Sequence, residues 1–437
     1  MTTQVIHNRH KHKTTRTNTA HQILRRLFRK YEGAFTIKLW DNSVLYIGKD
    51  VSAFTLTFHS PQVLRDLVLF NDPIRLAEDY FDGAVEVSGD FTAAMGLRYY
   101  LENLNLSLRE KLSLALRALL LGNQDSLKRQ KTKPLAKATR QNDVESIAFH
   151  YDVSNEFYKL WLDERMVYSC AYFETSEQDL ETAQRNKLDY ICRKLRLQKG
   201  ESYLDIGCGW GALVCWAAKH YGVRAHGITL SRNQYEYAVE EVKRQGLEDL
   251  VTIEMRNYRD LTREATYDKV SSIGMFEHVG LKNLHEYFSI VHQVLKPSGL
   301  FLNHGITSDE PDWNHGTSTQ FINRHVFPDG ELDTVSNIQL RMENANFEIF
   351  DVEGLRPHYA FTLRHWVKRL EEKSEEVIRL TGERTYRIWR LYMTGSAMQF
   401  EQGATGIYQI LAVRKENGMP DLPLTRRDLY TPKKITN

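Results

Sequence analysis

The stretch from residue 200 to residue 310 alternates short apolar segments with segments long enough to form a helix. Its apolar segments read YLDIGCGWG, VRAHGITL, LVTIEM, YDKVSSIG and LKPSGLFLNHGI. Parallel strands must be joined by crossover connections, and those connections are usually helices. The alternation therefore predicts an α/β fold in which a mostly parallel, doubly wound sheet is covered by helices on both faces. A last strand is expected in GIYQILAVRK, from Gly406.

The first third of the chain has a different pattern. FTIKLW and SVLYIG alternate apolar and polar residues around Asp41-Asn42, which predicts a β-hairpin. FTLTFH and the segment after Gly83 predict further strands, whereas LRDLVLF and residues 95–121 predict helices. We therefore expect a basic tail at 1–20, a small α+β domain at 21–121, a basic linker at 122–143 and the α/β domain at 144–437.

Charge is distributed unevenly along the chain, although the net charge is only +2. The first 30 residues contain eight Lys or Arg and no acid, and six more basic residues lie between Lys128 and Arg140, again without an acid. Such segments attract polyanions, either nucleic acid or anionic lipid headgroups, and each is equally compatible with a solvated tail or linker. No apolar run reaches the roughly 18 residues of a membrane span. Four cysteines are too few for a disulfide framework, so a reducing compartment, the cytoplasm, is expected.

A glycine-rich turn follows the first strand of the α/β region. The segment 203–206 is strand-like, Gly207-Cys208-Gly209-Trp210-Gly211 follows it, and the next residues predict a helix that ends at Gly222. Glycines between a strand and a helix let backbone N–H groups and the helix N-terminus approach a ligand closely. The turn is therefore a candidate ligand site.

The spacing of the glycines excludes two common ligand classes. The turn reads G-x-G-x-G rather than the G-x-G-x-x-G of dinucleotide enzymes, and the second strand ends in Thr229 and Ser231 instead of an acid. No Lys follows the glycines as in a phosphate-binding P-loop. Asp205, two residues before the first glycine, suits a ligand with positive charge and no phosphates, such as S-adenosylmethionine.

Several motifs resemble one known family. LDIGCGWG looks like the first motif of the class I methyltransferases. HYDVSNEFYKLWLDERMVYSCAYFE, GITLSRNQ, SSIGMFEHVGLKN, LKPSGLFLNHGIT and HYAFTLRHW together resemble the cyclopropane fatty acid synthase family, continuously from His150 to about Lys415. AEDYFDGAVEVSGDF in the first domain is similar to full-length bacterial members of that family.

The resemblance implies two sets of site residues. The cofactor-binding set adds to Asp205 a segment folded over the cofactor, a cradle for its methionine part and contacts to its ribose: Tyr168, Ser169, Gly207, Gly209, Trp210, Thr229, Leu230 and Gln234. The catalytic set surrounds a bicarbonate ion that serves as the base: Cys170, Glu277, His304, Ile306 and Tyr359. No metal site is expected. At the adenine end, Asn257 stands where the family usually has Asp.

Four of the five residues of the catalytic set also have a structural interpretation. Cys170 suits a plain buried thiol, Glu277 a helix cap, His304 a core histidine and Tyr359 an amphipathic aromatic residue. Glu277 and His304, however, lie at the expected carboxyl ends of strands, where open α/β sheets place ligands. Their position favours the functional interpretation.

The resemblance further implies methyl transfer from S-adenosylmethionine to the double bond of unsaturated acyl chains in membrane phospholipids. A carbocation forms, and loss of a proton to bicarbonate closes a cyclopropane. Alternatives are a methylene- or methyl-branched product, a small-molecule N-methyltransferase, and a binding protein without catalysis. The first domain implies access to phospholipid or dimerisation, so we expect a homodimer at the inner face of the membrane and no nucleic-acid partner.

Overall fold

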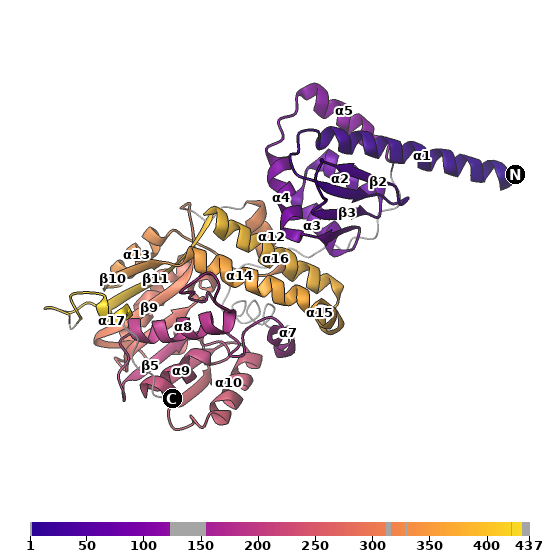
Figure 1. The fold of residues 1–437 in the computed structure, drawn as a ribbon. Helices are drawn as coiled ribbons and strands as arrows, with labels where there is room; N and C mark the ends of the chain where they lie inside the picture. Colours follow the sequence, from indigo (N-terminus) through magenta and orange to yellow (C-terminus); the bar gives the residue numbers. More distant parts are fainter. Residues whose placement is uncertain (1, 123–153, 312–315, 328–329, 421, 431–437) are drawn as a thin grey trace. The chain divides into compact units, whose positions relative to one another are not determined.

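The computed structural model describes residues 2–122, 154–311, 316–327, 330–420 and 422–430 (Figure 1). The chain forms two compact units. The first comprises Met1–Pro134 and Gly382–Thr394, and the second comprises Leu135–Thr381 and Gly395–Asn437. The predicted α/β domain at 144–437 therefore differs from the second unit, because residues 382–394 pack with the first. In that segment, Arg387 donates a hydrogen bond to the carbonyl of Tyr80 (2.7 Å) and Arg384 pairs with Glu78 (2.6 Å). The expected linker at 122–143 lies, apart from Gly122, outside the described residues.

The first unit is an α+β fold, as predicted. Its sheet has the order β2-β1-β3-β4, with an antiparallel hairpin of β1 and β2, a parallel β1–β3 pair and an antiparallel β3–β4 pair. The elements are α1 (Thr2–Leu27), β1 (Phe35–Lys38), β2 (Val44–Ile47), β3 (Phe54–Phe58), α2 (Pro61–Phe70), α3 (Pro73–Phe81), β4 (Val85–Gly89), α4 (Phe91–Glu102) and α5 (Leu108–Leu119). The helical run expected over 95–121 is divided in two, because Ser107 and Glu110 form a capping box that starts α5.

The basic tail expected at 1–20 is instead part of helix α1. Thr17, Thr19 and Ala20 are buried, and Thr17 donates a hydrogen bond to Asp41 (2.5 Å). Apolar periodicity does not predict the helical turn at residues 17–20, because two of its buried residues are threonines. The first unit therefore begins earlier than residue 21.

The second unit contains a seven-stranded sheet with the order β10-β11-β9-β8-β5-β6-β7. The parallel strands are β5 (Ser202–Ile206), β6 (Arg224–Thr229), β7 (Val251–Met255), β8 (Tyr267–Ile273) and β9 (Leu295–Ser308), and β10 (Phe347–Gly354) and β11 (Thr405–Arg414) complete the sheet with antiparallel pairs. The α/β prediction is confirmed. Strand β10 was not predicted, because FEIFDVEG carries three acids; Lys194 lies 2.5 Å from Glu353 and 3.7 Å from Asp351.

Helices cover both faces of this sheet, as the crossover argument requires. One face carries α8 (Leu180–Lys194), α9 (Ala212–Tyr221) and α10 (Arg232–Arg244), and the other carries α11 (Leu284–Val294) and α13 (Val335–Asn344). Successive residues of β5, Tyr203 and Leu204, belong to opposite core clusters. The remaining helices are α7 (Asn155–Lys159), α12 (Thr317–His325), α14 (Arg356–Glu372), α15 (Ser374–Thr381), α16 (Glu383–Gln402) and α17 (Arg427–Tyr430).

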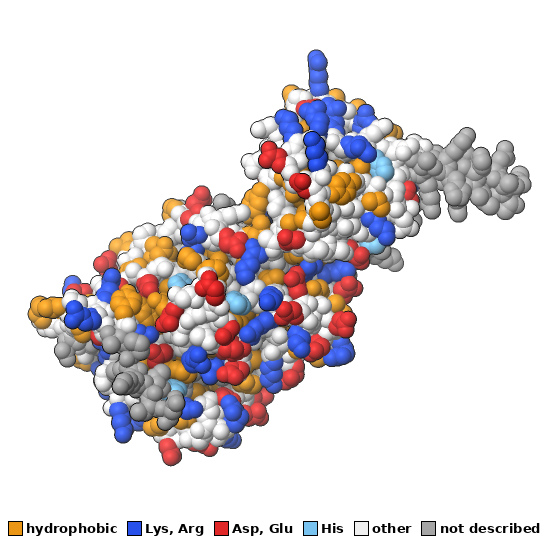
Figure 2. Space-filling model, in the orientation of Figure 1, with side chains coloured by type: hydrophobic (Ala, Val, Ile, Leu, Met, Phe, Trp, Pro, Cys, Tyr) orange, Lys and Arg blue, Asp and Glu red, His pale blue; other side chains and the backbone are white. Residues whose placement is uncertain are grey.

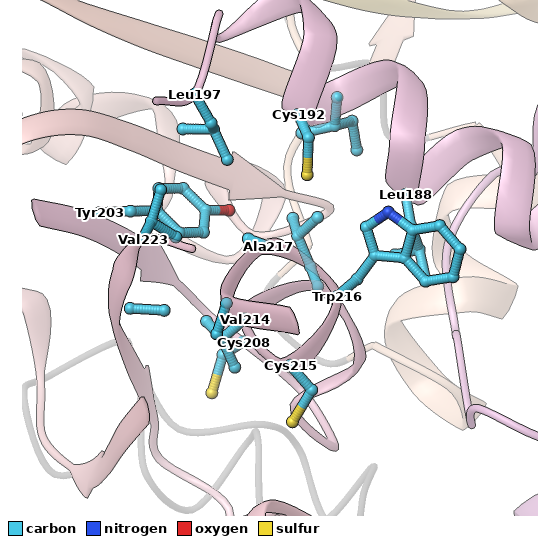
Figure 3. Packing of buried hydrophobic residues seen from close by; sticks show 14 of the residues in the cluster. Leu188, Cys192, Leu197, Tyr203, Cys208, Val214, Cys215, Trp216, Ala217 and Val223 are labelled. Atoms are coloured by element: carbon cyan, nitrogen blue, oxygen red, sulfur yellow. The ribbon is translucent and has the colours of Figure 1, made fainter. Parts of the chain in front are cut away.

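Three cysteines are part of the core that α8 and α9 form with the sheet: Cys192 on α8, Cys215 on α9 and Cys208 in the glycine turn. Figure 3 shows the thiols of Cys192, Cys208 and Cys215 among hydrophobic side chains. Burial raises the pKa of each thiol above its ordinary value, so these cysteines pack as small apolar residues. In the part of the chain that the structure describes, no helix is both long and apolar enough to cross a membrane.

The strand order places a ligand crevice at β5. The chain runs outward through β5, β6 and β7, and β8 then returns to the other side of β5. In open α/β sheets, ligands bind outside the carboxyl ends of the strands at such a switch point. The fold therefore predicts a ligand site at the turn after β5.

Candidate active site

The glycine turn adopts a conformation that favours glycine and is fixed to the neighbouring strand. Gly207 and Gly209 have φ angles of +80° and +56°. The backbone N–H groups of Gly207 and Cys208 both donate to the carbonyl of Ile228 on β6, at 2.9 and 3.0 Å. A Cβ atom at Gly209 would meet nothing within 4 Å, so this backbone borders open space. Such a turn leaves room for a ligand directly against the main chain.

A cavity lies over this turn, and we call it the glycine-turn cavity. All nine residues predicted to bind the cofactor line it: Tyr168, Ser169, Asp205, Gly207, Gly209, Trp210, Thr229, Leu230 and Gln234. The structure thus brings together three segments that are far apart in the sequence, 168–169, 205–210 and 229–234. Their contact with a cofactor stays a prediction.

Two polar pairs form part of the cavity wall. Asp205 accepts a hydrogen bond from Ser271 (2.5 Å), and Thr229 donates to Gln234 (2.8 Å). Burial raises the pKa of Asp205 to about 6, against the opposing effects of Ser271 and the nearby Lys187. Above that pH the carboxylate is ionised and offers a negative charge to a cationic ligand.

Aromatic residues and a short helix cover the turn. The indole N–H of Trp210 donates to the side-chain oxygen of Asn155 on α7 (2.8 Å), and the Tyr158 ring lies 5.0 Å from the Trp210 ring. Asn155 also donates to the carbonyl of Asn233 at the start of α10 (3.2 Å). Helix α7 is therefore held next to Trp210 at the glycine turn.

Lys187 lines the same cavity and was not predicted. It is buried on α8, and its ammonium group donates to the hydroxyl of Ser169 (2.9 Å). Burial lowers its pKa to about 8, and the carboxyls of Asp163 and Asp205 partly offset this shift. The sequence held one signal: Lys187 lies seven residues after Leu180, on the stripe of α8 that faces the core.

The adenine end of the predicted site contains the one departure from the family pattern. The side-chain oxygen of Asn257 accepts from the backbone N–H of Arg259 (3.0 Å) and caps the 3-10 helix η1 (Tyr258–Asp260). Its neighbours Arg256 and Tyr258 line the cavity and were also not predicted.

The five residues of the predicted catalytic set come from four segments, and we call them the Glu277 cluster. Glu277 lies in the 3-10 helix η2 (Phe276–His278) after β8, His304 and Ile306 lie on β9, Tyr359 lies in the first turn of α14, and Cys170 precedes α8. His304 and Ile306 are two residues apart on one strand and therefore share a face of the sheet.

Hydrogen bonds link most of this cluster through the main chain. The backbone N–H of Ile306 donates to Glu277 Oε1 (2.8 Å), so Glu277 contacts β9 instead of capping a helix. The carbonyl of Leu355 accepts from the N–H of Tyr359 (3.2 Å) and lies 3.9 Å from the thiol of Cys170. The N–H of Leu355 donates to Ile407 (2.9 Å), which pairs with Ile306 in the sheet.

Gly305 explains how Glu277 comes so close to β9. A Cβ atom at this position would lie 2.0 Å from the ring of Phe276 and 2.9 Å from Glu277 Oε1. A side chain would therefore push η2 away from the strand. The close approach requires glycine between His304 and Ile306.

Two buried polar atoms of the cluster are left without partners. Among the described residues, neither Glu277 Oε2 nor His304 Nε2 has a hydrogen-bond partner. Burial raises the pKa of Glu277 to about 7 and lowers that of His304 well below its ordinary value, so His304 is neutral. Buried polar groups are normally hydrogen-bonded. The carboxyl oxygen can accept a further hydrogen bond, and the imidazole nitrogen can donate or accept one.

The fold and the cavity define the class of the protein. A glycine turn at the switch point of a seven-stranded, mostly parallel sheet, with a buried acid and no dinucleotide or P-loop pattern, is typical of S-adenosylmethionine-dependent methyltransferases. A family model described as mycolic acid cyclopropane synthetase matches residues 138–410, more than half of the chain. The chain belongs to this family, and it is an S-adenosylmethionine-dependent methyltransferase.

Similar proteins agree with this assignment. A probable fatty acid methyltransferase of Pseudomonas putida is 40% identical over 398 residues, which cover 90% of this chain and 95% of that relative. The cyclopropane-fatty-acyl-phospholipid synthase of Escherichia coli K12 is 38% identical over 271 residues, which cover 62% of this chain and 68% of that relative. The solved mycolic acid cyclopropane synthase CmaA1, in complex with SAH and CTAB, is 32% identical with a TM-score of 0.59, over 62% of this chain and 98% of that one. The predicted family is confirmed.

Proposed function

We propose that this enzyme transfers the methyl carbon of S-adenosylmethionine to the double bond of unsaturated acyl chains in membrane phospholipids and closes a cyclopropane ring. The observation that carries the proposal is the Glu277 cluster, with two buried unpaired atoms in the same unit as the glycine-turn cavity. Alkylation of an alkene must end with the loss of a proton, so the enzyme needs a proton acceptor in a dry site. The names of the Pseudomonas putida and Escherichia coli relatives support an acyl substrate.

The bond changes follow from the reactants. A bond forms between the methyl carbon and one alkene carbon while the carbon–sulfur bond breaks, which leaves a cation on the other alkene carbon. Loss of a proton from the added methyl group frees its electron pair to close the three-membered ring. When bound, S-adenosylmethionine would supply the electrophilic carbon and bicarbonate would supply the proton acceptor.

The residues of this chain would hold these groups and exclude water. Asp205 and the glycine turn would bind the cationic part of the cofactor. Glu277 would accept a hydrogen bond from the bicarbonate hydroxyl, and neutral His304 would donate to one of its oxygens. The Glu277 carboxylate is itself oriented by the N–H of Ile306.

Aromatic rings near Tyr359 would stabilise the cation. The Tyr359 ring lies 4.8 Å from that of Phe400 and 6.0 Å from that of Trp366. An aromatic face close to a cation contributes roughly 0.5–2 kcal/mol and cannot be alkylated as easily as an amine. This arrangement suits a substrate on which a positive charge forms during the reaction.

A branched acyl chain is a second candidate product, since the Pseudomonas putida relative is named a probable fatty acid methyltransferase and that name mentions no cyclopropane ring. If the proton leaves a neighbouring chain carbon instead, the product carries a methylene or methyl branch. Incubation with isotopically labelled S-adenosylmethionine and monounsaturated phospholipid vesicles, followed by mass spectrometry of the fatty acids, separates the outcomes. A fatty acid that has gained one labelled carbon and no longer takes up hydrogen has lost its double bond and is the cyclopropane.

Matched vesicles of saturated phospholipid are the control, because they offer no double bond and must stay unlabelled. A labelled chain that still takes up hydrogen would indicate the branched product. Absence of labelled lipid together with tight cofactor binding would overturn the acyl substrate and favour the N-methyltransferase alternative. We further infer that the enzyme acts as a homodimer at the cytoplasmic face of the membrane, which light scattering and cell fractionation would test.

A further inference from the structure

Helix α5 in the first unit exposes a row of leucines. Leu108, Leu112, Leu116 and Leu119 are spaced by four, four and three residues and therefore share one face of the helix. The opposite face, with Leu114 and Ala118, is buried in the core of the unit. The exposed fractions, with that of the residue just after the helix, are Leu108 85%, Leu112 63%, Leu116 57%, Leu119 54% and Leu120 69%. A contiguous apolar surface of this kind marks an interaction site.

Basic residues flank these leucines on α5. Arg109 and Lys111 are exposed, and Arg117 is half-buried. The helix contains one acid, Glu110, whose carboxylate accepts hydrogen bonds from Ser107 and lies 3.4 Å from Arg26 of α1. The helix therefore combines an apolar surface with a net positive charge, since its three basic residues outnumber its one acid.

The neighbouring end of α1 adds to this charge. Arg117 donates a hydrogen bond to Gln22, so the two helices lie side by side. Arg25 and Arg26 are exposed on the α1 face that contains Gln22, and Arg29 is exposed just after the helix. Figure 2 shows Lys and Arg side chains gathered over this part of the first unit.

We propose that this surface inserts into the interfacial region of an anionic phospholipid bilayer. We define the α5 face as Leu108, Leu112, Leu116, Leu119 and Leu120 together with Arg109, Lys111 and Arg117. An amphipathic helix with apolar and cationic residues lies in the plane of a membrane, where its leucines enter the acyl boundary and its cations meet the headgroups. The inference rests on the proposed function, because it supplies the contact through which acyl chains in a bilayer would be reached.

Charge favours a bilayer over a second copy of the chain. A two-fold contact through the α5 face would place the same cations of two subunits close together. Like charges across an interface oppose association, whereas anionic headgroups neutralise them. The bilayer is therefore the occupant that fits both the leucines and the cations.

The test measures binding of the full chain to vesicles of saturated phosphatidylglycerol by co-sedimentation. These lipids have no double bond, so binding is measured independently of turnover and a failure of the proposed function would not affect it. We expect the variant with Leu112→Asp and Leu116→Asp to lose at least about tenfold in vesicle affinity, because each leucine leaves the acyl boundary. Leu340→Asp on α13 of the second unit, where Leu340 is 53% exposed, is the matched control and should bind as the unchanged protein does.

A second variant tests the charges. Arg109→Gln with Lys111→Gln should weaken binding to phosphatidylglycerol roughly fivefold per cation and leave binding to neutral phosphatidylcholine almost unchanged. Circular dichroism should show unchanged folding for all variants, since the replaced side chains are exposed. Equal vesicle binding by the leucine variant and the unchanged protein would overturn the proposal. Conversion of a dimer to a monomer with vesicle binding retained would also overturn it and identify a second copy as the occupant.

Discussion

Asp205 and Thr229 of the glycine-turn cavity differ in their hydrogen bonding from Glu277 and His304 of the Glu277 cluster. In the cavity, Asp205 is paired with Ser271 and Thr229 with Gln234. In the cluster, Glu277 Oε2 and His304 Nε2 have no partner among the described residues. An unpaired buried polar atom costs roughly 1–3 kcal/mol. Glu277 and His304 each leave one such atom unpaired, and a bound group that paired with both, as the proposed function requires, would offset this loss of stability.

The largest effect is expected from Glu277→Gln. The substitution keeps the size of the side chain but removes the acceptor for a hydroxyl of the bound group, so turnover should fall by roughly 10²–10⁴-fold. Binding of S-adenosylhomocysteine, measured by calorimetry, should change by less than about threefold, because the cavity contacts remain.

The stability of the same variant gives a second readout. The pKa of Glu277 is about 7 in the folded protein, above its ordinary value of 4.5, so the folded state binds more protons between these values. The free energy of unfolding should therefore fall as pH rises from about 4.5 to 7, and Glu277→Gln should lack this fall. Full activity of Glu277→Gln would show that the cluster is structural.

Substitution of two glycines with similar backbone conformations tests whether the glycine-turn cavity binds the cofactor. Gly209 and Gly246 have φ angles of +56° and +66°, and a Cβ atom at either would meet nothing within 4 Å. Ala at positive φ costs about 1–2 kcal/mol, so both substitutions should lower the free energy of unfolding by a similar amount. Only Gly209→Ala places a methyl group into the cavity, and we expect it to lose about tenfold in affinity for S-adenosylhomocysteine. Equal affinities for the two variants would place the cofactor elsewhere.

The same contrast explains what the sequence could predict. The cavity is built on one contiguous strand–turn–helix, whose glycines and Asp205 are readable from local pattern alone. The Glu277 cluster depends on contacts such as Glu277 with Ile306, which only the folded sheet creates, and the resemblance to a family was needed to name its residues. The sequence pattern did not predict that Thr17 belongs to α1 or that β10 is a strand. In both segments the buried or paired residues are polar, and apolar periodicity does not detect a threonine or an acid with a partner.

Lys187 was not predicted for the same reason. Its substitution is expected to have the smallest effect, a change in how stability depends on pH. Its pKa of about 8 lies below the ordinary 10.5, so between these values the unfolded chain binds more protons than the folded one. The free energy of unfolding should therefore rise with pH above about 8, by about 1 kcal/mol at pH 9, and Lys187→Met should lack this rise. Urea denaturation at pH 7 and pH 9 measures the difference.

Lys194, the second buried lysine of α8, is the matched control for cofactor binding. It pairs with Glu353 at 2.5 Å on β10, whereas Lys187 donates to Ser169 in the cavity wall. Lys187→Met should therefore weaken binding of S-adenosylhomocysteine a few-fold through the loss of one charge-assisted hydrogen bond to Ser169. Lys194→Met should leave binding unchanged and lower stability instead, because it removes one partner of Glu353 and of Asp351 on β10. Equal binding of S-adenosylhomocysteine by both variants would show that the hydrogen bond from Lys187 to Ser169 does not contribute to cofactor binding. The two buried lysines of α8 would then contribute to stability alone.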